Sequence, residues 1–138
     1  MKVNQTVVAL SLTLALAVGA HASMGSVAEK ARAAKQQAEE IQVLLKAKQL
    51  DAAKVAEKAS LLHDQADELH QVAAALERSN ADIAKVQDAA EIMKVLTESK
   101  LNVAQNATAK DREALKASAR NLATRAGWIA KTAAKIGG

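Results

Sequence analysis

The sequence predicts an all-α protein that folds as an antiparallel, up-down-up-down four-helix bundle with coiled-coil-like, alanine-rich seams. Three observations predict this fold class. The 138 residues include no proline, and no glycine occurs between Gly25 and Gly127, so this stretch contains neither of the two residues that most disfavour a helix. Apolar residues recur at steps of three and four. Helix-capping residues divide the chain into four segments of similar length.

Residues 1–22 are expected to be a signal peptide and not part of the fold. Lys2, the apolar run 7–18 and the small residues ending at Ala22 correspond to the three parts of a secretory signal. The apolar run is shorter than the roughly 20 residues that span a membrane, and a retained anchor is the alternative. Cleavage after Ala22 would leave 23–138 as a single helical-bundle domain in the periplasm or outside the cell.

Local capping signals predict where the first two helices begin. Ser26 and Glu29 match a capping box, in which each side chain satisfies a free backbone N–H of the other, so a first helix is expected over about 26–48. Asp51 is an acidic N-cap residue and opens a second helix over about 51–78.

The last two helices are predicted in the same way. The sequence Ser79-Asn80-Ala81-Asp82 is a capping cluster that opens a third helix over about 80–106. Thr108 precedes a fourth helix, expected over about 109–136, which ends at the terminal glycines.

Three of these helices carry a narrow apolar seam, and nearly half of the seam residues are alanine. Alanine lets helices approach closely, although it buries less apolar area than leucine does. A two-helix hairpin that dimerises is the alternative to the bundle. The seam residues are Val27, Ala31, Ala34, Ala38, Ile41 and Leu45 in the first helix, Val55, Ala59, Leu62, Ala66, Leu69, Ala73 and Leu76 in the second, and Leu115, Ala119, Leu122, Ala126, Ile129, Ala133 and Ile136 in the last.

The first two helices also contain an internal repeat. Residues 27–41 recur at 55–69, four heptads later, and eight of the fifteen positions are identical. Four heptads return a helical face to the same orientation, so the repeat supports two equivalent helices.

His63, Asp67 and His70 lie on one stripe of the second helix, beside its seam. Imidazole and carboxylate groups at this spacing can bind Zn²⁺, Cu²⁺ or Ni²⁺, and Asp64 or Glu68 could orient a ring nitrogen. The three residues are therefore the candidate metal ligands. The alternative is that His63 and Asp67 form an ordinary exposed pair on a helix.

A pattern of alanine, acidic residues and lysine leads up to the first of these histidines. It consists of Ala38-Glu39-Glu40, Lys46, Asp51, Lys58, Ser60, Leu61 and His63. This pattern resembles the repeat of the small periplasmic metal-binding proteins, which are alanine-rich, histidine-bearing four-helix chains with signal peptides. The resemblance implies binding of divalent copper, nickel or zinc for metal buffering, through His63 and His70. Gln37, Leu44 and Ala56 stand where that family has histidine, so the implied capacity is one site.

The last helix is basic and amphipathic. The chain carries a net charge of +4, and the segment from Lys110 onward holds seven basic residues against Asp111 and Glu113. With Trp128 near its end, this helix could contact an anionic membrane surface. The alternative is a fourth bundle helix whose cations complement the acidic second helix. Nucleic-acid binding is not expected, because the chain has one tryptophan and no phenylalanine or tyrosine for base stacking, and its net charge is modest.

No enzymatic activity is expected. The sequence has no glycine-rich phosphate loop and no nucleophile with a plausible base, so neither catalysis nor a nucleotide cofactor is indicated. The lack of cysteine excludes thiol redox chemistry and covalently attached haem, and no other haem site is expected. The predicted function is low-capacity binding of a divalent transition-metal ion in the periplasm. The alternative is a structural or interaction module of the cell envelope that meets another protein, a second copy of itself or an anionic surface.

Overall fold

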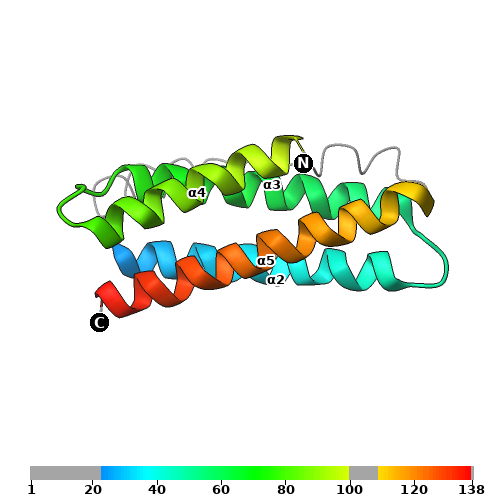
Figure 1. Ribbon diagram of the computed structural model, residues 1–138, viewed down its shortest axis with the longest axis horizontal. Helices are drawn as coiled ribbons and strands as arrows, with labels where there is room; N and C mark the ends of the chain where they lie inside the picture. The colour runs from blue at the N-terminus through cyan, green and yellow to red at the C-terminus, as the bar shows by residue number, and fades with distance from the viewer. Residues whose placement is uncertain (1–22, 100–108, 138) are drawn as a thin grey trace, which may run out of the picture.

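A computed structural model describes residues 23–99 and 109–137. These residues form four α-helices and no strand, so the predicted all-α fold class is confirmed (Figure 1). None of the described helices is long and apolar enough to cross a membrane. The expected signal peptide, the Thr108 cap and the end of the third predicted helix lie outside the described residues. The helices are α2 (Met24–Lys46), α3 (Ala52–Ala74), α4 (Ala81–Ser99) and α5 (Ala109–Gly137).

The four helices form a ring in which consecutive helices run antiparallel (Figure 1). α2 packs against α3 and α5, and α4 packs against α3 and α5. The end of α5 lies beside the start of α2, where a Cβ placed on Gly137 would lie 3.1 Å from the Met24 Cβ. The contact between α2 and α5 is the most extensive in the ring and that between α4 and α5 is the least extensive. The up-down-up-down bundle is thus tightest on one side of α5 and loosest on the other.

The core consists of the predicted seams. Every seam residue of α2, α3 and α5 is buried except Leu76 and Ile136, which are half-buried near helix ends. α4 adds Val86, Ala89, Ala90 and Met93 to this core. Alanine at so many of these positions allows the helix backbones to approach closely.

Two of the helices begin at residues whose capping was predicted. The Asp51 carboxylate accepts a hydrogen bond from the backbone N–H of Lys54 at 3.1 Å, at the start of α3. The Asn80 side-chain oxygen accepts one from the backbone N–H of Ile83 at 2.9 Å, at the start of α4. Both caps are local, so the sequence was sufficient to identify them.

The predicted cap of the first helix is wrong. Ser23 is the N-cap of α2, and its hydroxyl oxygen accepts a hydrogen bond from the backbone N–H of Ser26 at 3.2 Å. Ser26 therefore lies inside the first turn. The earlier start brings Met24 into the helix, where its side chain is buried against the end of α5.

The first two helices end earlier than their predicted ends at about residues 48 and 78. α3 ends at Ala74, where the buried Gln87 of α4 donates hydrogen bonds from Nε2 to the carbonyl oxygens of Ala73 and Leu76, each at 2.8 Å. α2 ends at Lys46, and Arg112 of α5 donates a hydrogen bond to the Ala47 carbonyl oxygen at 2.9 Å. Side chains from other helices thus donate hydrogen bonds to carbonyl oxygens at these two helix ends.

Candidate functional site

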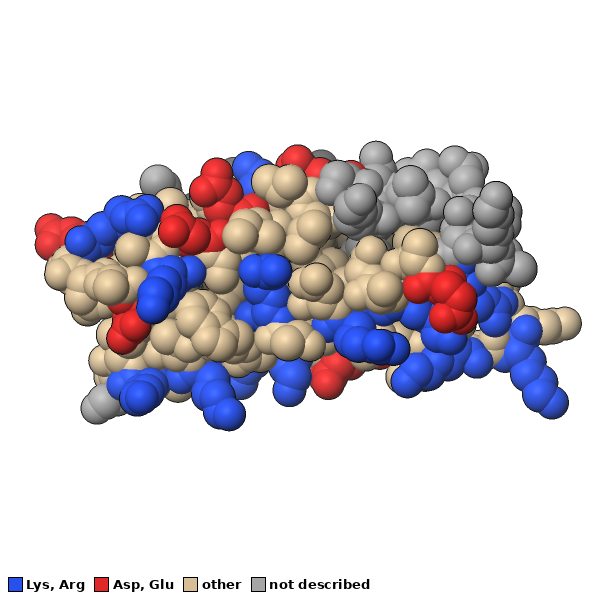
Figure 2. All heavy atoms as spheres, viewed as in Figure 1, with Lys and Arg blue, Asp and Glu red and all other residues tan. Residues whose placement is uncertain are grey.

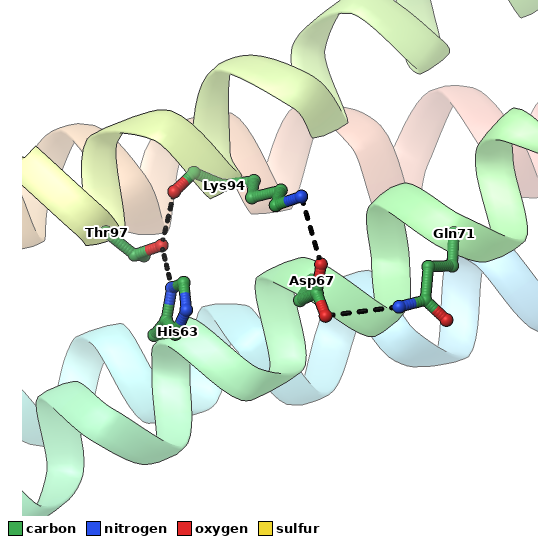
Figure 3. A network of polar contacts seen from close by, with 5 residues as sticks. All are labelled: His63, Asp67, Gln71, Lys94 and Thr97. Carbon is green, nitrogen blue, oxygen red and sulfur yellow. Dashed lines mark hydrogen bonds and ion pairs between the residues drawn. The ribbon is translucent and has the colours of Figure 1, made fainter.

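The predicted metal-ligand residues lie on α3, and two of them, His63 and Asp67, are directed toward α4 (Figure 3). His63 is half-buried, and its Nδ1 lies 3.1 Å from the hydroxyl oxygen of the buried Thr97 on α4. The Thr97 hydroxyl donates its single proton to the Lys94 carbonyl oxygen at 2.8 Å. Its oxygen must therefore accept a hydrogen bond from Nδ1–H of His63. In the neutral ring, this arrangement leaves the lone pair of His63 on Nε2.

Thr97 takes the orienting role that the sequence suggested for Asp64 or Glu68. The Glu68 carboxylate instead forms an ion pair with Lys30 of α2 at 3.2 Å. A residue on a neighbouring helix, 34 positions along the chain, thus holds the imidazole.

Asp67 is engaged at both carboxylate oxygens. Oδ1 lies 3.3 Å from the Lys94 ammonium, and Oδ2 accepts a hydrogen bond from the Gln71 side-chain amide at 3.1 Å (Figure 3). A metal ion bound to Asp67 would have to displace Lys94, because the two cations repel each other.

His70 lies two helical turns beyond His63, which is a rise of about 10.5 Å. It is half-buried, and its Nδ1 is a buried atom with no hydrogen-bond partner. Within the described parts of the chain, no group of three or more His, Cys, Asp or Glu residues is arranged to hold a metal ion. Metal binding through His63, Asp67 and His70 therefore stays a prediction from the sequence.

A groove of about 790 Å³ lies between α4 and α5, on the loosest contact of the ring. Figure 2 shows this face, with blue basic side chains among tan ones where α4 and α5 meet. A smaller hollow of about 190 Å³ at Leu96 and Ser118 shares Ala117 and Asn121 with the groove and extends it along both helices. The groove is lined by Lys85, Asp88, Ala89 and Ile92 of α4 and by Ala117, Arg120, Asn121, Thr124, Arg125 and Trp128 of α5.

Two large apolar side chains face solvent in this groove. Ile92 is 42% exposed and Trp128 is 43% exposed, one on each wall. Apolar side chains gathered in one exposed hollow are more characteristic of a binding surface than the same side chains scattered singly.

The charges of the groove are unbalanced. Lys85, Arg120 and Arg125 form no ion pair with any described residue, whereas Asp88 is paired with Arg78 at 3.5 Å. Arg125 donates one long hydrogen bond to the Asn121 side-chain oxygen at 3.5 Å, and its Nε is a buried donor without a partner. The groove thus combines an apolar surface with cationic groups whose donors are largely unused.

The sequence identified Trp128 and the basic character of the last helix, but not this groove. Its α5 wall follows one helical stripe, from Ala117 through Asn121 and Thr124 to Trp128. That stripe mixes apolar, polar and cationic residues and does not register as an apolar seam. The α4 wall becomes relevant only once the fold places it beside α5.

No protein-family model matches the sequence, and no curated protein and no solved structure is significantly similar to it. The function must therefore be inferred from the chain's own residues.

Proposed function

We propose that this protein is a binding module without catalytic activity, and that it binds its ligand in the groove between α4 and α5. The groove offers apolar side chains on both walls and cations without counter-charges. Clefts of this size, mostly apolar with a few polar groups, are typical of binding sites.

The observation that carries this proposal is the contrast between the α4–α5 contact and the other contacts of the ring. Among the described residues, ion pairs join α2 to α3, through Lys30–Glu68 and Lys58–Glu40, and α3 to α4, through Asp67–Lys94. α2 and α5 are in close contact at Gly127, where an added Cβ would lie 3.5 Å from the Lys35 side chain. No ion pair or side-chain hydrogen bond between described residues joins α4 to α5. A ligand that fills this groove would supply the missing contacts.

Photo-crosslinking in living cells tests the proposal and requires no assumption about which ligand is bound. A benzophenone side chain in place of Thr124, which lines the groove, is expected to form an adduct upon irradiation. The control places the same group at Val43 of α2, which is 69% exposed and lies outside the groove. No adduct at either position, or the same adducts at both, would contradict a binding function of the groove.

We further propose that the protein acts in the periplasm or outside the cell after cleavage following Ala22. The signal-like sequence of residues 1–22 supports this location. Cleavage there would keep Ser23, the N-cap of α2, as the first residue of the mature chain. The mass of the chain recovered from the periplasm or medium tests this proposal, and a mass that includes residues 1–22 would contradict it.

Low-capacity binding of Cu²⁺, Ni²⁺ or Zn²⁺ is a second candidate function. Its support is the hydrogen bond from His63 Nδ1 to Thr97, which orients the ring and leaves Nε2 for a metal ion. Calorimetric titration of the untagged chain is expected to give saturable binding near one equivalent. Replacing His63 and His70 by alanine should abolish it while the helix content stays unchanged, and identical isotherms for the two proteins would refute it.

A further inference from the structure

We propose that the ligand of the α4–α5 groove is a single-chain amphiphile with an anionic head group, such as a carboxylate or a phosphate. The alkyl chain would lie between the two helices, and the head group would contact Arg125 and Lys85. This inference rests on the proposed function of the groove and adds the chemical class of its ligand.

The dimensions of the groove match a small amphiphile. Its volume of about 790 Å³ lies in the range of small-molecule sites, which is about 300–1,000 Å³. The α5 wall from Ala117 to Trp128 rises by about 16 Å, roughly the length of an extended twelve-carbon chain. The hollow at Leu96 continues the groove beyond Ala117 and leaves room for the end of such a chain.

The apolar surface lies where the alkyl chain would be. Ile92 and Ala89 line the α4 side, and Ala117 and Trp128 line the α5 side. Burial of the exposed parts of Ile92 and Trp128 would remove apolar surface from water, which favours an apolar ligand over a purely polar one.

Two of the three unpaired cations, Lys85 and Arg125, lie at one end of the groove, so we place the head group there, while Arg120 lies toward the other end. Because α4 and α5 run antiparallel, Lys85 lies toward the Trp128 end of the groove, and Leu96 lies toward the Ala117 end. Arg125 is one helical turn from Trp128, at the same end as Lys85. The Arg125 guanidinium makes one long hydrogen bond, to Asn121 at 3.5 Å, so its terminal N–H groups can donate to a carboxylate or phosphate oxygen. Among the described residues that line the groove, the only acidic one is Asp88, which is paired with Arg78.

Trp128 makes the inference directly measurable. It is the only aromatic residue of the chain, so the intrinsic fluorescence comes from one wall of the groove. Titration of the purified, untagged chain with monomeric dodecanoate or dodecyl phosphate should give a saturable blue shift near one equivalent. Dodecyl maltoside, which has a similar chain and no charge, should bind about tenfold more weakly.

Two variants separate the contributions of charge and apolar surface. Arg125→Gln combined with Lys85→Gln should weaken the binding of both anions by about tenfold. The charge-matched control, Arg32→Gln combined with Lys131→Gln, changes exposed cations outside the groove and should leave affinity unchanged. Ile92→Asp should abolish the blue shift, and circular dichroism verifies that each variant keeps its helix content.

Three results would overturn the inference. The first is the absence of a saturable blue shift with either anion. The second is equal affinity for the uncharged amphiphile, or equal losses in the groove and control variants. The third is binding to phosphatidylglycerol vesicles without binding of monomeric amphiphile, which would identify a membrane surface as the partner. A cellular adduct at position 124 together with no amphiphile binding would overturn the ligand class and leave the groove as the binding surface.

Discussion

Gln87 is a single buried polar side chain that satisfies carbonyl oxygens at the end of a neighbouring helix. Its amide nitrogen donates to two carbonyl oxygens at the end of α3, those of Ala73 and Leu76. Without it, both carbonyl oxygens would lose a donor, and the oxygen of the buried Ala73 would keep the backbone N–H of Leu76. Thr97 plays a comparable role for the imidazole of His63. In both cases a residue of α4 completes a feature of α3.

Substitution of Gln87 by methionine should destabilise the fold. Gln87→Met has a similar shape but removes both hydrogen bonds, so the free energy of unfolding should fall by about 2 kcal/mol. Urea denaturation followed by circular dichroism measures this change. Gln36→Met, at an exposed position of α2, should have little effect, and equal unfolding midpoints for the two variants would contradict the role of Gln87.

Substitution of Thr97 by valine tests whether it orients a metal ligand. If His63 binds a metal ion, Thr97→Val removes the acceptor that holds its ring and should weaken affinity for Ni²⁺ or Cu²⁺ by about tenfold. Calorimetry measures this effect. The control is Thr124→Val, on α5, which should leave the affinity for the metal ion unchanged. Equal affinities for both variants and the parent protein would show that Thr97 does not orient a metal ligand.

At the scale of the helices, local signals were readable in the sequence and signals from other helices were not. Asp51 and Asn80 cap helices through backbone groups three residues away, and both were predicted. The seams were predicted equally well, because their period depends only on the helix itself. At the ends of α2 and α3, carbonyl oxygens accept hydrogen bonds from Arg112 and Gln87, which the fold brings from distant parts of the chain.

Ser23 and Ser26 are the two alternative N-cap residues at the start of α2. Ser23→Ala should lower the free energy of unfolding by about 1 kcal/mol, because it removes the N-cap oxygen. Ser26→Ala should cost much less, since Ser26 contributes its backbone N–H and not its side chain to the cap. Thermal denaturation of the two variants distinguishes them, and a larger loss for Ser26→Ala would restore the capping box predicted from the sequence.

At the scale of the whole molecule, the bundle combines one close helix pair with one open pair. α2 and α5 meet through alanine and Gly127, whereas α4 and α5 leave a groove. The sequence predicted four helices and the buried faces of three of them, and it marked Trp128 and the basic last helix. The groove could not be predicted, because it depends on how far α4 and α5 stand apart.

The close packing of the core makes it sensitive to added volume. Ala34 is fully buried and Ala33, its neighbour on α2, is exposed. Ala34→Leu should therefore destabilise the fold by about 1–3 kcal/mol, and Ala33→Leu should have little effect. Urea denaturation compares the two variants. Similar stabilities would show that the bundle has room at Ala34 and is not closely packed there.

The most direct test of the central claim is protection of the groove in cells. The natural chain has no cysteine, so Thr124→Cys and Val43→Cys each introduce a single exposed thiol, one in the groove and one on α2. If the groove holds a ligand, a maleimide should label the Thr124→Cys thiol more slowly in intact cells than in the protein unfolded and refolded after purification. The labelling rate of Val43→Cys is measured under the same two conditions. The ratio of its two rates corrects for how readily the maleimide reaches the protein inside cells. Equal rate ratios for the two variants would contradict a ligand in the groove.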